Sequence, residues 1–384
     1  MAMHLLLILN CLWIQLASAS GLASPSTNNM ALPQTYRALV AETTGNSFSE
    51  VATIKSIPIP TVGDDEILIR VRYAGINGGC ETFRARGEFA FQGNAKATAD
   101  DPFQLGAEGV GIIAAVGPNI DIDDYNVGDA VCFVGSAFSE YSLCKSTATL
   151  WKIPECKPEY VGLRISGLTA CAMLEKTGRL ESGETVLITA AAGGAGHFAV
   201  QFAKLVGCTV IGTCGSKEKA EVLRGLGCDH VINYKEEDVA AEIGRLAPDG
   251  LDAALEGVGG TMLQIALDHL KKKGRLLQIG YISEYPHNPD AKVESSKNDV
   301  DASDLFWNSK TIQRGEQTIY GNAWPKDYGA VADCKARVLG LFEEGKIKSL
   351  VDDEEEFVGL ESVTEAIQHM LSGRTIGKVV VRIQ

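Results

Sequence analysis

The sequence has no excess of positive charge. Its 384 residues include 35 Lys and Arg against 49 Asp and Glu, a formal net charge of −14 at pH 7. A field of that sign repels nucleic acid and anionic membrane surfaces, so we expect neither as a partner. A small anionic ligand is not excluded, because a local site can oppose the overall charge. The composition is otherwise that of a globular chain long enough for two domains.

Long hydrophobic runs are also scarce. The clearest lies in residues 1–20, "MAMHLLLILNCLWIQLASAS", where an apolar stretch precedes the small-x-small sequence Ala17–Ala19. The run is too short for a convincing membrane helix, so we expect no stable membrane insertion. Two interpretations of the start stay open: a cleaved targeting peptide over 1–20, secretory or organelle-directed, or translation from Met30. Residues 21–35 have the composition of a linker.

Closely spaced cysteine pairs are missing as well. The ten cysteines form no C-x-x-C pair, and the sequence contains no Asn-x-Ser/Thr glycosylation site. Several cysteines lie inside apolar runs, as buried thiols do. This usage favours a reducing compartment for the mature protein, which conflicts with a secretory leader, and the sequence leaves the compartment open.

From residue 184 onward, short apolar strands alternate with helical patterns. The sequence predicts strands at 184–191, 209–215, 230–234, 251–258 and 274–280, and helices at 197–207, 219–227, 237–247 and 262–273. Strand–helix alternation with few loop residues is typical of βαβ units in a doubly wound parallel sheet. We therefore predict a Rossmann-type domain over residues 161–323.

The two flanks have a different pattern. Residues 36–160 carry short alternating strands interrupted by Gly and Pro, which predicts an irregular, antiparallel, barrel-like domain. The last segment, 324–384, ends with a helix at 360–373 and a strand at 377–384. The polar stretch 283–304 has no periodicity, and we expect it to be an exposed loop bordering a substrate pocket.

A glycine-rich stretch, "AAGGAG" (Ala191 to Gly196), lies between the first predicted strand and its helix. Gly193 would let a pyrophosphate approach the backbone, and Gly196 would let the helix pack closely on the strand. The N–H groups at the start of the helix would then meet the phosphate charge. In this strand–turn–helix context the motif predicts dinucleotide binding.

The end of the next strand indicates which dinucleotide is bound. NAD sites usually place Asp or Glu there, whereas this sequence reads "VIGTCGSKEKAEVL" with no carboxylate before Glu218. Small polar residues with Lys217 and Lys219 suit an additional 2′-phosphate. The alternative is that both lysines are ordinary solvated residues at a helix start. We predict NADPH.

Many colinear motifs resemble those of the medium-chain dehydrogenase/reductase superfamily, and of its zinc-independent quinone oxidoreductase branch in particular. They include "YAGIN" (73–77), "LGAEGVG" (105–111), "VLITAAAGGAG" (186–196), "LGCDHVINYK" (226–235) and "GRLLQIGYIS" (274–283). The resemblance covers nearly all of residues 36–384. It implies an α/β architecture in which a GroES-like antiparallel β-barrel catalytic domain, from 36–160 and 324–384, surrounds the Rossmann NADP-binding domain.

The resemblance also implies a set of cofactor contacts. The pyrophosphate loop would be Gly193, Gly194, Ala195 and Gly196. The adenosine 2′-phosphate would be surrounded by Gly215, Ser216, Lys219 and Tyr234. The nicotinamide side would be lined by Gly257, Ile279, Tyr285 and, from the C-terminal segment, Thr375. Gly215 and Gly257 each replace a serine of the reductase pattern, so they can offer backbone bonds only.

The ligands of the zinc-dependent relatives are missing. Asn77 stands where zinc alcohol dehydrogenases have a ligand cysteine, and Ala107 stands where they have a histidine. The stretch 93–103, in place of a four-cysteine lobe, contains no cysteine. Zinc requires three or four such ligands. We therefore expect no metal site and a reaction that uses NADPH alone.

Without a Lewis acid, the expected reaction is hydride delivery to an already polarised acceptor. We predict NADPH-dependent reduction of the activated C=C bond of α,β-unsaturated ketones of the oxo-lipid type. Candidate donors to the developing enolate oxygen are Tyr73, Asn77 and Tyr285, besides the cofactor ribose. Asn77 could equally cap a turn, Tyr73 could be a core residue, and Glu108 is expected to be structural.

Two alternatives to this function remain. One is an NADPH:quinone oxidoreductase on the same scaffold, and the other is a non-catalytic NADPH-binding protein. The intact glycine loop and 2′-phosphate cluster favour an enzyme, but both features report cofactor binding rather than turnover. Relatives of this kind pair through the last strand of the Rossmann sheet, so 317–321, "QTIYG", is a candidate edge for a homodimer.

Overall fold

The computed structural model describes residues 32–45, 47–79, 88–89, 93–94, 102–145, 147, 150–285, 300–325 and 328–384. The chain divides into two units, 1–33 and 34–384, and the elements below all belong to the second. The predicted targeting peptide and most of the linker lie outside the described residues. Within the described part, no helix is both long enough and apolar enough to cross a bilayer.

The N-terminal part of the second unit is built mainly from strands. Its elements are β1 (Thr35–Ala41), α1 (Phe48–Val51), β2 (Ala52–Pro58), β3 (Ile67–Gly75), β4 (Glu88–Phe89), β5 (Gly93–Asn94), β6 (Phe103–Gln104), β7 (Glu108–Val116), β8 (Ala130–Val134), β9 (Tyr141–Cys144) and β10 (Trp151–Ile153). Alternation along β1 buries Tyr36 and Ala38 while Thr35 and Arg37 face solvent, as expected of a sheet with one covered face.

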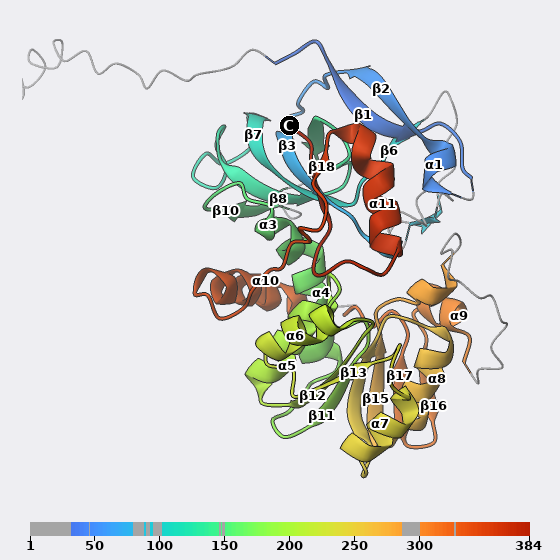
Figure 1. Ribbon diagram of the computed structural model, residues 1–384. Coiled ribbons are helices and arrows are strands. Elements are labelled where there is room, and N and C mark those ends of the chain that lie inside the picture. Colours follow the sequence, from blue (N-terminus) through green and yellow to red (C-terminus); the bar gives the residue numbers. More distant parts are fainter. Residues whose placement is uncertain are drawn as a thin grey trace, which may run out of the picture. The chain divides into compact units, whose positions relative to one another are not determined.

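The last elements of the chain join this N-terminal part. They are α10 (Tyr328–Glu343), β18 (Phe357–Val358), α11 (Val363–Leu371) and β19 (Val380–Arg382). The strand order is β10-β8-β7-β3-β19-β18, and β19 pairs antiparallel with β3, placing Val380 opposite Gly75. Figure 1 shows α11 and the red C-terminal segment beside the blue N-terminal strands. Among the described strands the pairing is an open path rather than a closed ring.

The middle of the chain forms the predicted Rossmann sheet and the helices around it. A helical stretch leads into it through α3 (Glu159–Gly162), the π turns Leu163–Gly167 and Met173–Thr177, and α4 (Leu168–Ala172). The alternating elements follow: β11 (Thr185–Ile188), α5 (Gly196–Val206), β12 (Thr209–Cys214), α6 (Lys217–Gly225), β13 (His230–Asn233), α7 (Val239–Leu246), β14 (Leu251–Glu256), α8 (Gly260–Asp268), β15 (Leu270–Gln278), α9 (Ala302–Trp307), β16 (Thr311–Arg314) and β17 (Gln317–Tyr320).

This sheet has the order β13-β12-β11-β14-β15-β17-β16, parallel except for the β16–β17 pair. The order reverses direction at β11 and β14, as in doubly wound folds. Residues of α4, α5 and α6 pack in the core on one face, and those of α7, α8 and α9 pack in the core on the other. Figure 1 shows these helices around the central strands. The predicted α/β class, with a Rossmann sheet and a GroES-like part, is confirmed.

Two predictions about local structure are wrong, and a third, about the sheet edge, is corrected in the next paragraph. The helix expected over 262–273 ends at Asp268, and Lys271–Lys273 belong to β15, because Leu270 pairs with Leu251 of β14. The loop expected over 283–304 is not uniformly exposed: Tyr285 and Val300 are buried, and α9 begins at Ala302. Residues 286–299 of that stretch lie outside the described part.

The third correction concerns the edge of the Rossmann sheet. Strand β17, expected to pair with a second copy, has β15 on one side and β16 on the other. Both of its backbone edges are therefore used within the chain, and β16 is the strand at the end of the sheet. The predicted dimer through 317–321 does not fit this arrangement.

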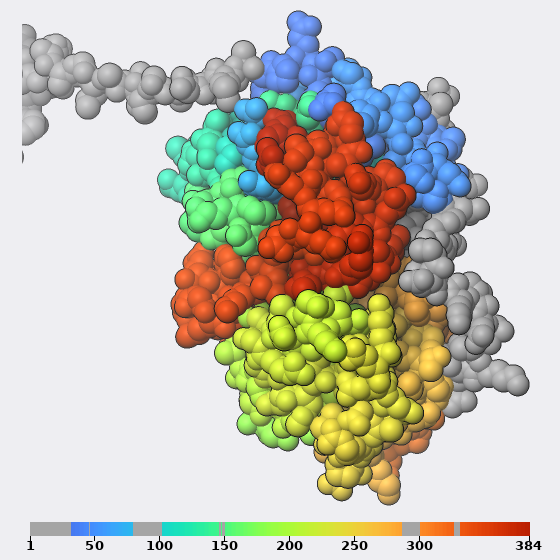
Figure 2. Space-filling model, viewed as in Figure 1, coloured from blue at the N-terminus to red at the C-terminus, as the bar shows by residue number. Residues whose placement is uncertain are grey.

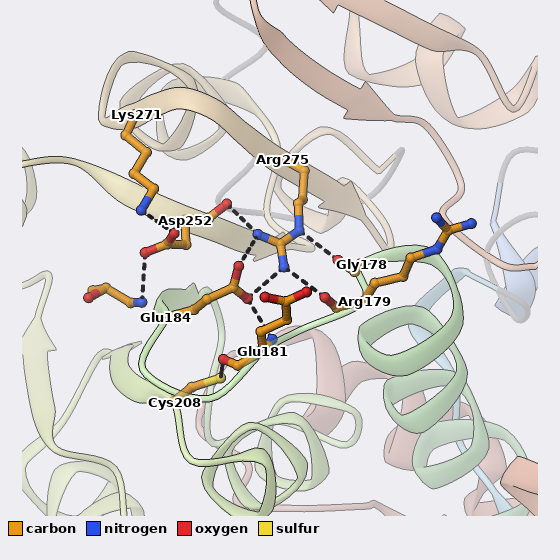
Figure 3. A network of polar contacts seen from close by, with 9 residues as sticks. Gly178, Arg179, Glu181, Glu184, Cys208, Asp252, Lys271 and Arg275 are labelled. Carbon is orange, nitrogen blue, oxygen red and sulfur yellow. Dashed lines mark hydrogen bonds and ion pairs between the residues drawn. The ribbon is translucent and has the colours of Figure 1, made fainter.

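An ion-pair network lies where β11, β14 and β15 begin (Figure 3). Arg275 meets Glu184 through two bonds, Nη1 to Oε1 at 2.7 Å and Nη2 to Oε2 at 2.6 Å. The remaining Arg275 donors go to the carbonyls of Gly178, Arg179 and Asp252. Both side chains of the pair are only about one-sixth exposed, 16% and 17%. Together with these backbone bonds, the bidentate pair links the helical segment before β11 to strand β15 of the sheet.

Candidate functional site

The glycine-rich loop connects β11 to α5. A Cβ atom built on Gly196 would lie 2.4 Å from the Ala190 carbonyl oxygen, so only glycine lets the helix start this close to the strand. Gly193 is more open, with its nearest such contact at 3.2 Å. No side chain caps α5 at Ala195, which leaves the N–H groups of its first turn without a side-chain partner. Such a helix start suits an anionic group.

The C-terminal segment is hydrogen-bonded to this loop. Gly377 N donates to the Ala192 carbonyl at 2.8 Å, and Gly377 forms a bridge with Gly193. The candidate residue Thr375 is buried in the same segment, with 8% of its surface exposed. The structure thus brings Thr375 close to the predicted pyrophosphate loop, although the two are about 180 residues apart in sequence.

A buried histidine braces the loop from within α5. Leu350 N donates to His197 Nε2 at 3.1 Å, so the ring proton is on Nδ1, which donates to the Gly193 carbonyl at 2.9 Å. Burial lowers the pKa of His197 to about 4, so the ring is neutral at physiological pH. His197 is a structural support for the glycine loop.

Asn77 belongs to a closed polar triangle next to the loop. Lys378 Nζ lies 2.6 Å from Glu108 Oε1 and 2.7 Å from Asn77 Oδ1, and Asn77 Nδ2 donates to Glu108 Oε1 at 2.9 Å. Glu108 also accepts from Ile165 N at 2.9 Å. Glu108 and Lys378 are withdrawn from water, with 0% and 2% exposed. The triangle joins three segments: the turn after β3, the start of β7 and the segment just before β19.

The aliphatic part of Lys378 passes between two glycines. A Cβ on Gly75 would lie 2.8 Å from Lys378 Cε, and one on Gly194 would lie 3.6 Å from Lys378 Cδ. The triangle therefore lies directly against the glycine-rich loop. Tyr73, the other catalytic candidate, is half-buried on β3 and pairs across to Arg382 of β19.

The candidate 2′-phosphate residues converge where β12 and β13 end. Ser216 is the N-cap of α6, and its hydroxyl accepts from Lys219 N at 3.3 Å. A Cβ on Gly215 would lie 2.5 Å from the Tyr234 hydroxyl oxygen, so the tyrosine covers that glycine closely. Lys219 Nζ donates to the Gly373 carbonyl at 2.5 Å, which brings the C-terminal segment to this place as well.

The loop after β14 carries the candidates for the nicotinamide side. The buried Glu256 carboxylate accepts from Val258 N at 2.7 Å and from Gly259 N at 3.0 Å, and so fixes the turn that holds Gly257. Desolvation raises the pKa of Glu256 to about 7. Ile279 N donates to the Glu256 carbonyl at 2.7 Å, which places the two strand ends side by side.

Tyr285 is buried beside Gly280, where an added Cβ would lie 2.9 Å from its hydroxyl oxygen. The adjoining Ile282 reaches the Asn77 loop: its Cδ1 lies 3.2 Å from the position of a Cβ on Gly78. The loops after β3, β14 and β15 therefore meet near Asn77. The sequence analysis predicted that Asn77, Ile279 and Tyr285 belong to one site. In the structure their backbone segments lie next to one another.

Sequence reasoning missed three buried charged or titratable residues here. Lys378 precedes the apolar run that begins β19, and Glu256 follows the apolar run of β14, so a charge at the end of an apolar run was the available signal. His197 follows the glycine motif at a position that appeared to be an ordinary helix residue. None of the three could be assigned a partner without knowing which segments meet.

One group of potential metal ligands occurs in the described residues: Cys171, Glu175 and Cys334, whose ligand atoms lie within 4.8 Å of one another. Arg337 already binds this Glu175 at 2.5 Å. At the two positions where the resemblance implies ligands in zinc-dependent relatives, this chain has Asn77 and Ala107, and the alanine side chain has no ligand atom. None of the described cysteines, including the half-buried Cys156, forms a disulfide.

Comparison with known proteins places this site in a family. A family model described as Zinc-binding dehydrogenase matches residues 194–334, and one described as Alcohol dehydrogenase GroES-like domain matches residues 63–180. The chain is 37% identical over 360 residues to Prostaglandin reductase-3 of Mus musculus, covering 92% of this chain and 91% of that one. The motifs in the sequence resemble prostaglandin reductase 3 in particular, and this match confirms the likeness.

Two further relatives are oxidoreductases by name. A Probable quinone oxidoreductase of Leishmania amazonensis is 34% identical over 360 residues, covering 92% of this chain and 100% of that one. A 2-alkenal reductase (NADP(+)-dependent) of Nicotiana tabacum is 35% identical over 254 residues, covering 65% and 69%. With its GroES-like and Rossmann parts and these relatives, the chain belongs to the medium-chain dehydrogenase/reductase superfamily, within its quinone oxidoreductase-like members.

Proposed function

We propose that the protein is an NADPH-dependent, zinc-independent reductase of the activated C=C bond of α,β-unsaturated ketones, with oxo-lipids such as 15-oxoprostaglandins as the substrate class. The observation that carries the proposal is the Asn77–Glu108–Lys378 triangle packed against the glycine-rich loop. Its polar groups lie beside that loop and near the loops proposed for the nicotinamide side, which supports hydride transfer to a polarised acceptor near Asn77 without a metal.

The residues present fit NADPH. Gly193, Gly194, Ala195 and Gly196 would hold the pyrophosphate, because the α5 start lacks a side-chain cap and Gly196 leaves no room for a side chain. At the end of β12, Cys214, Gly215 and Ser216 provide no carboxylate to accept from a ribose 2′-hydroxyl. Ser216, Lys219 and Tyr234, with the backbone of Gly215, would surround a 2′-phosphate. Gly257, Ile279, Tyr285 and Thr375 would line the nicotinamide side.

The bound cofactor would supply a hydride to the β-carbon of the enone. The protein must then stabilise negative charge on the carbonyl oxygen, until a proton from water or a side chain reaches the α-carbon. Asn77 would donate to that oxygen: one Nδ2 hydrogen goes to Glu108, and the nearest acceptor for the other, the Gly75 carbonyl, is a weak 3.5 Å away. Lys378, bound to Asn77 Oδ1, holds the amide in this orientation. Tyr73 is the second candidate donor.

The absence of a catalytic metal is part of the proposal. A Zn²⁺ ion at Asn77 and Glu108 would have to displace the Lys378 ammonium, which already neutralises the carboxylate at 2.6 Å. Two cations cannot share that buried oxygen without strong repulsion. Asn77 is also a poor replacement for the thiolate that zinc prefers.

The name of the tobacco relative, a 2-alkenal reductase, supports a conjugated C=C acceptor, and that of the mouse relative supports a prostaglandin-type one. The Leishmania relative favours a quinone as the second candidate acceptor. The third reading is an NADPH-binding protein without turnover. These three hypotheses differ in which acceptor, if any, the protein reduces.

A substrate panel separates the three. NADPH loss would be followed with an aliphatic enone, a 15-oxoprostaglandin and a quinone, and NADPH formation with a simple alcohol and NADP, all with EDTA. Enone turnover with a saturated ketone as the product supports the proposal. Quinone turnover alone favours the second candidate, and tight NADPH binding without turnover on any acceptor favours the binding protein.

A further inference from the structure

Two buried cysteines meet where α10 packs against α4. Cys171 of α4 and Cys334 of α10 are both 0% exposed, and their sulfur atoms lie within 4.8 Å of each other. They belong to one hydrophobic cluster, although they are far apart in the sequence. Figure 2 shows the orange-red residues of α10 at the molecular surface, so the pair lies beneath a surface helix. The proposed reductase reaction uses neither thiol.

The two helical segments approach closely at this point because a glycine adjoins the cysteines. A Cβ atom built on Gly167, four residues before Cys171, would lie 3.4 Å from Cγ1 of Val338, four residues after Cys334. A spacing of four residues keeps each pair on one face of its helix, so the two pairs meet in antiparallel order. The gap between the sulfur atoms is one that a change of rotamer at one cysteine can close.

A carboxylate connects the two thiols to the surface. An oxygen of Glu175 lies within 4.8 Å of both sulfur atoms, and the Glu175 side chain is 21% exposed. Arg337, itself 40% exposed, binds that carboxylate through Nε at 2.5 Å. Glu175 is therefore already neutralised by a cation, which disfavours a metal ion among these three residues. The two thiols then have each other as the nearest reactive groups.

The contact between the thiols makes one of them the more reactive. A hydrogen bond between the two lowers the pKa of Cys334 and raises the pKa of Cys171, so Cys334 ionises first. The thiolate is the nucleophilic form of cysteine. Cys334 is therefore the sulfur that reacts first with an oxidant, and Cys171 is placed to attack the product.

We propose that Cys171 and Cys334 form a redox-active dithiol, which a hydroperoxide converts into a disulfide linking α4 to α10. The Cys334 thiolate attacks one peroxide oxygen and the O–O bond breaks, giving a sulfenic acid. The other oxygen takes up the Cys334 proton and leaves as an alcohol or, from hydrogen peroxide, as water. The Cys171 sulfur then attacks the sulfenic acid, and the expelled hydroxide takes the Cys171 proton as water. The thiols lose two electrons, which the hydroperoxide gains.

Peptide mapping of the full-length wild type tests this directly. The reduced protein would be treated with hydrogen peroxide, its remaining thiols alkylated in denaturant, and the chain digested with trypsin without reductant. Trypsin cuts on both sides of each cysteine, so Cys171 lies in peptide 165–176 and Cys334 in peptide 327–335, each with no other cysteine. We expect the two peptides to be joined and to separate on reduction. Recovery of the two peptides apart, alkylated or as sulfinic acids, would overturn the proposal.

Cys334→Ser and Cys208→Ser are the matched variants. Cys208 is buried in the same hydrophobic cluster, but its thiol donates to the Glu181 carbonyl at 3.4 Å. Peroxide should raise the melting temperature of the wild type and of Cys208→Ser by a few degrees, because the bond constrains the unfolded chain, and should leave Cys334→Ser unchanged.

Two other outcomes would also overturn the proposal. A cross-link that fails to raise the melting temperature of the wild type would show that the bond forms only in a distorted protein. Stoichiometric zinc on the reduced wild type, lost in Cys334→Ser, would assign the thiols to a metal instead.

Discussion

Lys378 Nζ lies 2.6 Å from Glu108 Oε1 in the interior of the protein, although the two residues are 270 positions apart. The pair links two neighbours of β3 in the GroES-like part. Glu108 begins β7, Lys378 precedes β19, and both strands pair with β3. It also fixes Asn77 against the glycine loop. Stability and the geometry of the candidate site therefore depend on the same contact.

Replacing Lys378 with Met should destabilise the fold by about 3–5 kcal/mol, because Glu108 is then left buried without its counter-ion. The measurement is urea unfolding near neutral pH. The double variant Lys378→Met with Glu108→Gln should recover part of the loss, since no uncompensated charge remains. Equal losses in the single and double variants would contradict the assignment of the penalty to a stranded carboxylate.

Asn77→Ala should lower kcat by about 10-fold or more while changing the NADPH dissociation constant little, because the amide is proposed to donate to the substrate oxygen and not to the cofactor. Steady-state kinetics and cofactor titration give the two numbers. Asn77→Asp is a useful partner, since it keeps the shape but places a second carboxylate beside Glu108. Unchanged turnover in Asn77→Ala would remove Asn77 from the proposed mechanism.

Glu256 should make stability fall as the pH rises. Its pKa of about 7 in the folded protein exceeds the ordinary value of 4.5, so ionisation costs stability progressively between those two pH values. The loss is on the order of 3 kcal/mol. Glu256→Gln stays neutral and keeps an acceptor for Val258 and Gly259. It should match the wild type near pH 4.5 and exceed it in stability at pH 8.

Unfolding curves between pH 4.5 and pH 8 test this dependence. Glu344→Gln, at an exposed carboxylate paired with Lys346, is the control and should follow the wild type throughout. A constant difference between Glu256→Gln and the wild type across the whole range would show that the carboxyl does not titrate in this window.

Arg275→Lys should destabilise the Rossmann part by about 2 kcal/mol or more, although it keeps the charge. An ammonium cannot reproduce the bidentate bond to Glu184 together with the bonds to Gly178, Arg179 and Asp252. Arg245→Lys, at an exposed pair with Glu242, is the matched control and should change stability by less than about 0.5 kcal/mol. Thermal unfolding of both variants gives the comparison.

Chelation should leave activity intact. Dialysis against EDTA is expected to change kcat by less than a few per cent, since the proposed chemistry uses no metal at Asn77. Cys171, Glu175 and Cys334 could bind zinc away from Asn77, so a variant without this cluster is the control. Any zinc bound to the wild type should be lost in Cys334→Ser, whereas turnover should be unchanged. Activity that falls with zinc removal and returns with zinc would contradict the zinc-independent mechanism.

The sequence predicts the local elements of this fold better than its long-range contacts. Strand–helix alternation from residue 184 located β11 to β15, and the glycine motif located the start of α5, because both signals are periodic or steric and lie within a few residues. Lys271–Lys273 were misplaced because three lysines fit a helix end and an exposed strand start equally well. Backbone pairing of Leu270 with Leu251 decided between them.

The site itself was only partly predictable. Asn77 could be singled out because it replaces a metal ligand, but its partners could not, since Glu108 and Lys378 meet it only after β3, β7 and β19 align. Likewise, Lys219 could be predicted as a phosphate residue from its sequence context, whereas its contact with Gly373 depends on how α11 ends. Buried charged residues are therefore the part of the site that a single sequence reveals least.

The most direct test of the central claim is the fate of hydride. The protein would be incubated with NADPH carrying deuterium in both C4 positions of the nicotinamide, an aliphatic enone and EDTA, and the product analysed by mass spectrometry and NMR. The proposal predicts a saturated ketone with one deuterium at the β-carbon and none at the α-carbon. Recovery of the allylic alcohol with deuterium on the carbonyl carbon, or of unchanged enone, would contradict it.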